Sequence, residues 1–150
     1  MTAALHLAGS EDADRCVALA AAAISERGGT PDAEVLRDAI DPLLAGTPHG
    51  ALYLIGPRKS PVGFLAVSFG WSVAEGGLVA RIDEIFIREG VRGRGMGSEV
   101  LAALLPRLEG AGIRSVHAVA ETANAGLQRL FARHGFAARA EHVILTRRAD

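Results

Sequence analysis

The feature that most constrains this chain is a long apolar strand that runs into a glycine-rich turn and then into a helix. The strand pattern covers residues 78–87, the turn is Arg92-Gly93-Arg94-Gly95-Met96-Gly97, and helical spacing begins at Ser98. At the start of a helix, several backbone N–H groups lack an intrahelical partner and point outward at the positive end of the helix dipole. A strand, turn and helix in this order therefore predict an anion site, with phosphate as a typical ligand.

The turn fits neither of two well-known phosphate motifs. The dinucleotide-binding fingerprint requires glycine where this chain has Ser98, and a Walker A loop requires lysine where it has Gly97. Gly95 and Gly97 allow the backbone to approach an anion closely, and Arg92 and Arg94 add positive charge. On the turn alone, the alternative is an ordinary loop with glycines for turning and arginines on the surface.

The rest of the pattern predicts one mixed α/β domain that spans residues 1–150. With 49% apolar residues, a chain of this length can bury one substantial core. Short apolar runs bounded by turn residues predict strands, and apolar residues spaced three and four apart predict helices. In chain order these are a strand at 5–8, helices at 11–26 and 30–44, a hairpin of strands at 51–56 and 63–69, a strand at 78–87, a helix at 98–108, a strand at 116–119, a helix at 124–133 and a last strand at 143–146.

The composition argues against several classes of function. Sixteen basic and 17 acidic residues leave a net charge of -1, so no global field attracts nucleic acid or an anionic membrane. There is no signal-peptide pattern and no apolar run near the roughly 18 residues of a membrane span, so we expect a soluble, cytoplasmic protein. Cys16 is the single cysteine, expected to be buried and inert, and the five histidines lack metal-ligand spacing, so no metal is expected.

With its flanks, the glycine-rich turn resembles the GNAT superfamily of acyl-CoA N-acyltransferases. Arg92, Gly95 and Gly97 meet the superfamily pattern Arg/Gln-x-x-Gly-x-Gly/Ala. The matching motifs cover residues 82–136, and the sequence of residues 95–101 looks most like that of small-amine or polyamine acetyltransferases. The other matching motifs are Ile82-Asp83-Glu84-Ile85-Phe86-Ile87, similar to the family's fourth strand, and Asn124, Leu130-Phe131 and Gly135-Phe136, similar to its second motif.

The resemblance implies a central, mostly antiparallel sheet with one splayed parallel strand pair and about four flanking helices. Acetyl-CoA would be the cosubstrate, with its pyrophosphate on the turn and its pantetheine arm between strands 78–87 and 116–119. An extended arm that carries amides can bond to an open strand edge, here through the backbone of Ile85 and Ile87. The implied cofactor residues are Ile85, Phe86, Ile87, Arg92, Gly93, Arg94, Gly95, Met96, Gly97, Ser98, Asn124 and Phe131.

Two of these positions leave a question open. Asn124 is equally suited to cap the helix that follows it and to reach the pantetheine arm. Phe131 stands where the family has a tyrosine that protonates the leaving thiolate, and Tyr53, on an early strand, is not assumed to replace it. A thiol has a pKa of about 8.5, so its thiolate can leave unprotonated and transfer need not be lost.

The implied activity is acetyl transfer to a primary amine by direct attack on the thioester. An alkyl ammonium with a pKa of about 10.4 must first lose a proton, and a carboxylate is the expected base. Asp83 and Glu84 are the candidates, unless both are solvated surface charges. Pleating should send them to opposite faces, with Glu84 favoured as a base acting through water unless a bulge reverses the faces. A backbone amide near Phe86 would stabilise the oxyanion.

The acceptor stays open at this point: it could be a small-molecule or a peptide amine. Glu26, Glu75 and Glu121 could meet a cationic amine, with a solvated surface charge as the alternative for each. A non-catalytic acyl-CoA-binding or sensing domain is the alternative function, motivated by Phe131 and the undecided base. A weaker alternative is a nucleotide-binding module that uses the same turn. No nucleic-acid or membrane partner is expected, and a homodimer could form through an open sheet edge near the C-terminus.

Overall fold

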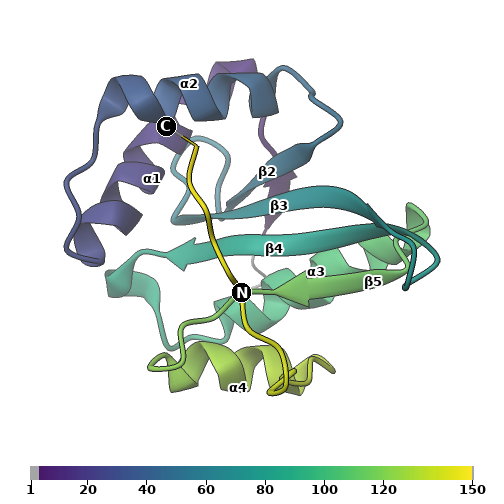
Figure 1. Ribbon diagram of the computed structural model, residues 1–150. Coiled ribbons are helices and arrows are strands. Elements are labelled where there is room, and N and C mark those ends of the chain that lie inside the picture. Colours follow the sequence, from purple (N-terminus) through teal and green to yellow (C-terminus); the bar gives the residue numbers. More distant parts are fainter. Residues whose placement is uncertain (1–3, 150) are drawn as a thin grey trace.

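The computed structural model describes residues 4–149 and shows a five-stranded sheet between two layers of helices (Figure 1). The strands lie in the order β1-β2-β3-β4-β5; β1 to β4 are antiparallel, and β4 and β5 are parallel. The mixed, mostly antiparallel sheet with one parallel pair is therefore confirmed. The elements are β1 (Leu5–Leu7), α1 (Ala13–Glu26), α2 (Ala33–Leu44), β2 (Gly50–Ile55), β3 (Gly63–Ser72), β4 (Gly77–Ile87), α3 (Met96–Gly110), β5 (Ser115–Ala118) and α4 (Ala125–Arg133), with short 3-10 turns at Ser10–Asp12 and Glu89–Val91.

The sheet separates two hydrophobic clusters. Phe64 packs under α1 and α2, whereas its neighbour Leu65 packs against α3, as the two-residue period of a strand requires. The apolar spacing predicted for the helix at 98–108 is confirmed, because Val100, Leu101 and Leu104 are fully buried in the second cluster. In the part of the chain that the structure describes, no helix is both long enough and apolar enough to cross a membrane.

The predicted last strand at 143–146 is wrong. Residues 137–149 form neither helix nor strand and are exposed throughout, and Val143, Ile144 and Leu145 keep 80%, 72% and 89% of their surface in solvent. A run with strand propensity becomes a strand only when a neighbouring strand supplies hydrogen bonds and a packed face. Within residues 4–149, β5 has a strand partner on one side only, so the expected open edge exists, and its pairing with a second copy stays a prediction.

Removal of residues 141–149 should leave the midpoint of thermal unfolding unchanged within about 2 °C, because this segment buries little apolar surface. Circular dichroism melts of the full and shortened chains test this. A fall of more than about 5 °C would show that the segment packs against the domain in solution.

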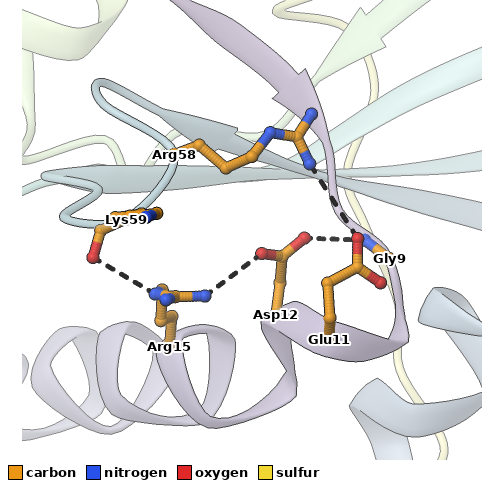
Figure 2. A network of polar contacts seen from close by, with 6 residues as sticks. All are labelled: Gly9, Glu11, Asp12, Arg15, Arg58 and Lys59. Carbon is orange, nitrogen blue, oxygen red and sulfur yellow. Dashed lines mark hydrogen bonds and ion pairs between the residues drawn. The ribbon is translucent and has the colours of Figure 1, made fainter.

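A polar network ties the corner between β1 and α1 to the loop between β2 and β3 (Figure 2). Asp12 is 1% exposed, and its carboxylate accepts from the Gly9 N–H at 2.9 Å and from Arg15 at 3.4 Å. Arg15 also donates to the Lys59 carbonyl at 3.2 Å. A buried carboxylate is tolerated when its oxygens are bonded in this way, and the network fixes the start of α1 against the sheet.

Asp12→Ala should lower the free energy of unfolding by about 2 kcal/mol, since it leaves the Gly9 N–H and the Arg15 guanidinium without their shared acceptor. Asp14→Ala is the matched control. Asp14 is also an ion-paired acid of α1, but it is 90% exposed, and its loss should cost less than about 1 kcal/mol. Equal effects of the two changes in urea denaturation would contradict this role of Asp12.

Candidate functional site

A β-bulge in β4 shapes the site. Ala66 of β3 pairs with Glu84, but the next residue, Val67, pairs with Ile82. Asp83 is therefore an extra residue on β4 that has no counterpart on β3. A bulge of this kind changes the phase of the pleat beyond it by one residue.

The phase change decides which β4 side chains face which layer. Ile82 packs in the cluster under α3, and so do Ile85 and Ile87, whereas Phe86 contacts the cluster under α1 and α2. Pleating alone would send Asp83 and Glu84 to opposite faces; with Asp83 as the bulged residue, both line one cleft.

Beyond the bulge, β4 and β5 separate. The two strands pair from Val79 with Ser115 as far as Ile82 with Ala118, and the last contact is the Val119 N–H donating to the Ile82 carbonyl at 3.3 Å. From there β4 continues to Ile87, and the described chain supplies no strand on that side. The splayed parallel pair expected from the sequence is present.

The backbone of β4 faces this gap at alternate residues. The Arg88 N–H donates to the Val62 carbonyl at 2.8 Å, so Arg88 faces the β3 side. Because backbone groups alternate sides along an antiparallel strand, Phe86 also faces β3, and Ile85 and Ile87 face the gap. The backbone amide expected near Phe86 is therefore that of Ile85 or Ile87, not that of Phe86 itself.

The glycine-rich turn presents the start of α3 to the same cleft. Gly93 and Gly95 adopt left-handed backbone, with φ of 78° and 75°, which a side chain would disfavour. The first hydrogen bond of the helix runs from the Glu99 N–H to the Gly95 carbonyl at 3.1 Å. The N–H groups of residues 96–98 precede it, and the N-cap residue, Gly95, has no side chain to cap this helix end.

Gly97 and Ser98 also fasten α3 to α4. A Cβ on Gly97 would come 2.9 Å from Leu130 Cδ2, so glycine permits the close approach of the two helices. Ser98 Oγ lies 2.7 Å from His134 Nε2, just beyond the end of α4. The Ser98 hydroxyl thus contacts α4, which leaves the backbone N–H as its group for an anion.

Arg92 is held by acceptors of the chain itself. Its two terminal nitrogens lie 2.7 Å from the two Glu26 carboxylate oxygens, and its Nε donates to the Ile87 carbonyl at 2.6 Å. The guanidinium also lies 5.6 Å from the centre of the Phe86 ring. The hydrogen bond from Arg92 lowers the pKa of the Glu26 carboxyl, and the same bond raises the pKa of the guanidinium.

The two candidate bases each face an arginine. Asp83 Oδ1 accepts from Arg81 Nε at 2.6 Å, within β4. Glu84 Oε1 lies 3.1 Å from Arg27 Nη1, at the end of α1. Glu84 and Arg27 are about half exposed, with 41% and 51% of their side-chain surface in solvent. The end of α1 therefore reaches both the turn, through Glu26, and the candidate base, through Arg27.

The opposite wall of the cleft comes from the segment that follows β5 and from α4. Asn124 caps α4, because its Oδ1 accepts from the Leu127 N–H at 3.0 Å, and it lines the cleft as well. Phe131 is 4% exposed and packs against Phe136 with ring centres 5.0 Å apart, so it belongs to the core. The cleft encloses about 860 Å³, and its lining includes Glu26 and Glu121, which the sequence left open between an acceptor contact and a solvated charge. The lining residues that the sequence did not reveal as site residues are Arg27, Val119, Ala120, Gly126, Leu127, Leu130 and Arg133.

Three further residues, expected or considered for chemistry, lie outside this lining. Arg94 and Tyr53 do not line the cleft. Cys16 is 1% exposed in α1, and burial raises the pKa of its thiol to about 11, so it is not a thiolate nucleophile. Among residues 4–149, no three His, Cys, Asp or Glu side chains gather closely enough to hold a metal ion.

The cleft combines two features of one class of protein. A helix start with unbonded N–H groups suits a phosphate, and the open β4 edge beside it suits an extended arm that carries amides. The model of the acetyltransferase (GNAT) family matches residues 4–136. The chain belongs to this family.

Solved structures share the whole fold. An integron cassette protein from the mobile metagenome of Cole Harbour Salt Marsh superposes with a TM-score of 0.86 at 23% identity, over 97% of this chain and 91% of that one. The aminoglycoside N-acetyltransferase AAC(6')-Iy in complex with CoA gives 0.80 at 17% identity, over 97% and 94%. A predicted acetyltransferase with acetyl-CoA from Clostridium acetobutylicum gives 0.76 at 16%, over 96% of each. No functionally curated protein matches the sequence.

The Glu26 carboxyl should titrate below its usual pKa of about 4.3 in carboxyl-detected NMR, and Arg92→Gln should raise its pKa toward that value. A depressed folded-state pKa means that the pair stabilises the fold above the unfolded pKa and that this contribution is lost as pH falls through the folded value. The effect is small because both side chains are about 40% exposed. Arg94→Gln, in the same turn, should leave the titration unchanged; an unshifted Glu26 in the native chain would contradict the pairing.

Proposed function

We propose that this protein is an acetyl-CoA-dependent N-acetyltransferase that moves an acetyl group to a primary amine. The observation that carries the proposal is the continuity of the open β4 edge with the start of α3 in one cleft. The pyrophosphate would accept from the N–H groups of residues 96–98. The pantetheine arm would bond to the backbone of Ile85 and Ile87, with Leu127 and Leu130 along its other side.

This placement gives each cofactor residue a specific role. Gly93, Gly95 and Met96 would contact the cofactor mainly through the backbone, since all three line the cleft at the turn. Arg94 would add charge from outside the lining. Arg92 would hold the turn in shape through its pair with Glu26 and add positive charge beside the phosphates. The relatives solved with CoA and with acetyl-CoA support this cosubstrate.

The chemistry follows from the position of the thioester near the bulge. The neutral amine attacks the thioester carbon, the C–S bond breaks, and CoA leaves as a thiolate. The nitrogen loses its second proton to water as the neutral amide forms, and the thiolate takes up a proton from solvent after it leaves. Glu84 takes the proton of the ammonium through water, with Asp83 as the second candidate. The N–H of Ile85 or Ile87 stabilises the oxyanion. Phe131 is buried in the core, so no acid acts from that position.

The acceptor is an amine, either a small molecule or a peptide. Four carboxylates, those of Glu26, Asp83, Glu84 and Glu121, line the cleft and suit a cationic nitrogen. The sequence of residues 95–101 and the structural similarity to an aminoglycoside N-acetyltransferase both favour a small amine. Phe131 favours the second candidate, a domain that binds acyl-CoA without transferring the acyl group.

Calorimetry with acetyl-CoA and a thiol-release assay over a broad amine panel test the proposal. Glu84→Gln should lower kcat by about 100-fold because it removes the base, while the Kd for acetyl-CoA stays within about twofold. Asp83→Asn is the matched control and should lower kcat far less. Acetyl-CoA binding without thiol release for any amine would favour the sensing domain, and no binding at high micromolar concentration would reject both functions.

A further inference from the structure

We propose that Arg27 occupies, in the free protein, the position that the ammonium group of the acceptor takes beside Glu84. The acceptor would then be an amine that is cationic when it binds and displaces the guanidinium. This inference rests on the proposed function and adds a residue that sets the specificity for the acceptor.

Two residues at the end of α1 form ion pairs with two different walls of the cleft. Glu26, the last residue of the helix, pairs with Arg92 on the turn, and Arg27, the next residue, pairs with Glu84 on β4. All four side chains line the cleft. Of these two adjacent residues, Glu26 thus contacts the turn that is proposed to bind the cofactor, and Arg27 contacts the candidate base.

The two ion pairs differ in their geometry. Glu26 and Arg92 meet through two oxygens and two nitrogens, both at 2.7 Å, whereas Arg27 and Glu84 meet through one contact at 3.1 Å. Paired contacts between a guanidinium and a carboxylate are the stronger arrangement. Glu26 therefore anchors the helix end, and Arg27 is the partner that can be exchanged.

Exchange at Glu84 requires little free energy. Both side chains of the pair are about half exposed, and pairs of this kind contribute little to stability. Arg27 lies at the C-cap of α1, and Gly28, which follows with a φ of 84°, has open space around its Cβ position. The guanidinium can swing out while the helix stays fixed by Glu26.

The product differs from the acceptor in charge, which gives the exchange a direction. An ammonium can replace Arg27 beside Glu84, because both are cations. The amide formed by transfer is neutral, so it cannot compete with the Arg27 guanidinium for the Glu84 carboxylate. Arg27 therefore competes with the charged acceptor on entry and helps to displace the product.

The test compares Arg27→Gln with the native chain. The variant should lower the KM of an alkyl amine by up to about fivefold, since it removes a competitor worth at most about one small surface ion pair. The Kd for acetyl-CoA should not change by more than twofold. Arg27→Lys, which keeps the cation, should behave as the native chain does, and Arg37→Gln, whose arginine pairs with Asp14 and Asp41 outside the cleft, should have no effect.

A charge-matched pair of probes makes the outcome independent of turnover. Cyclohexylamine is cationic at pH 7.5, and aniline is a neutral ring of similar size. Calorimetry on the CoA-loaded protein should show tighter cyclohexylamine binding in Arg27→Gln and unchanged aniline binding. Unchanged or weaker cyclohexylamine binding, with acetyl-CoA binding intact, would overturn this inference and leave the proposed function standing. If the native chain itself does not bind acetyl-CoA, the proposed function is rejected instead.

Discussion

One extra residue in β4 determines where the rest of the site lies. Because Asp83 has no counterpart on β3, the pleat changes phase, and the backbone groups of Ile85 and Ile87 point into the gap left by β5. The same change turns Glu84 toward the end of α1. Without the bulge, the backbone of β4 would turn its other residues to the gap, and the open edge and the candidate base would not share one cleft.

The sequence predicted the order of elements up to α4 because that information is local. Apolar spacing and turn residues gave the helices and strands within a few residues, and the turn before α3 was found from its glycines and its context. The failed strand at 143–146 has the right side chains, but a strand also needs a partner edge, which no local pattern reports. The position of the bulge was not predicted for a related reason, since a bulge is a property of the register between two strands.

The site residues divide in the same way. Except for Arg94, the expected residues of the turn and of β4 line the cleft, because one motif places them in consecutive positions; their roles toward the cofactor stay predictions. Arg27 could not be predicted, and neither could the pairing of Glu26 with Arg92 across 66 positions. Glu26 itself was open between an acceptor contact and a solvated charge, because nothing near residue 26 decides between the two. Asn124 was open between two roles, and the structure shows its helix cap, which is compatible with a second contact in the cleft.

The absence of a tyrosine at position 131 matters less than the base does, as the proton transfers show. At pH 7.4 an alkyl ammonium of pKa about 10.4 lies about three units above the pH, so its neutral form costs roughly 4 kcal/mol. A thiolate of pKa about 8.5 lies only about one unit away, and it can take a proton from solvent after it leaves. In the proposed reaction the larger barrier is therefore on the amine side, where Glu84, which pairs with Arg27, would be the base. A chain that keeps a carboxylate there can place Phe131 in the core without losing the step that most needs catalysis.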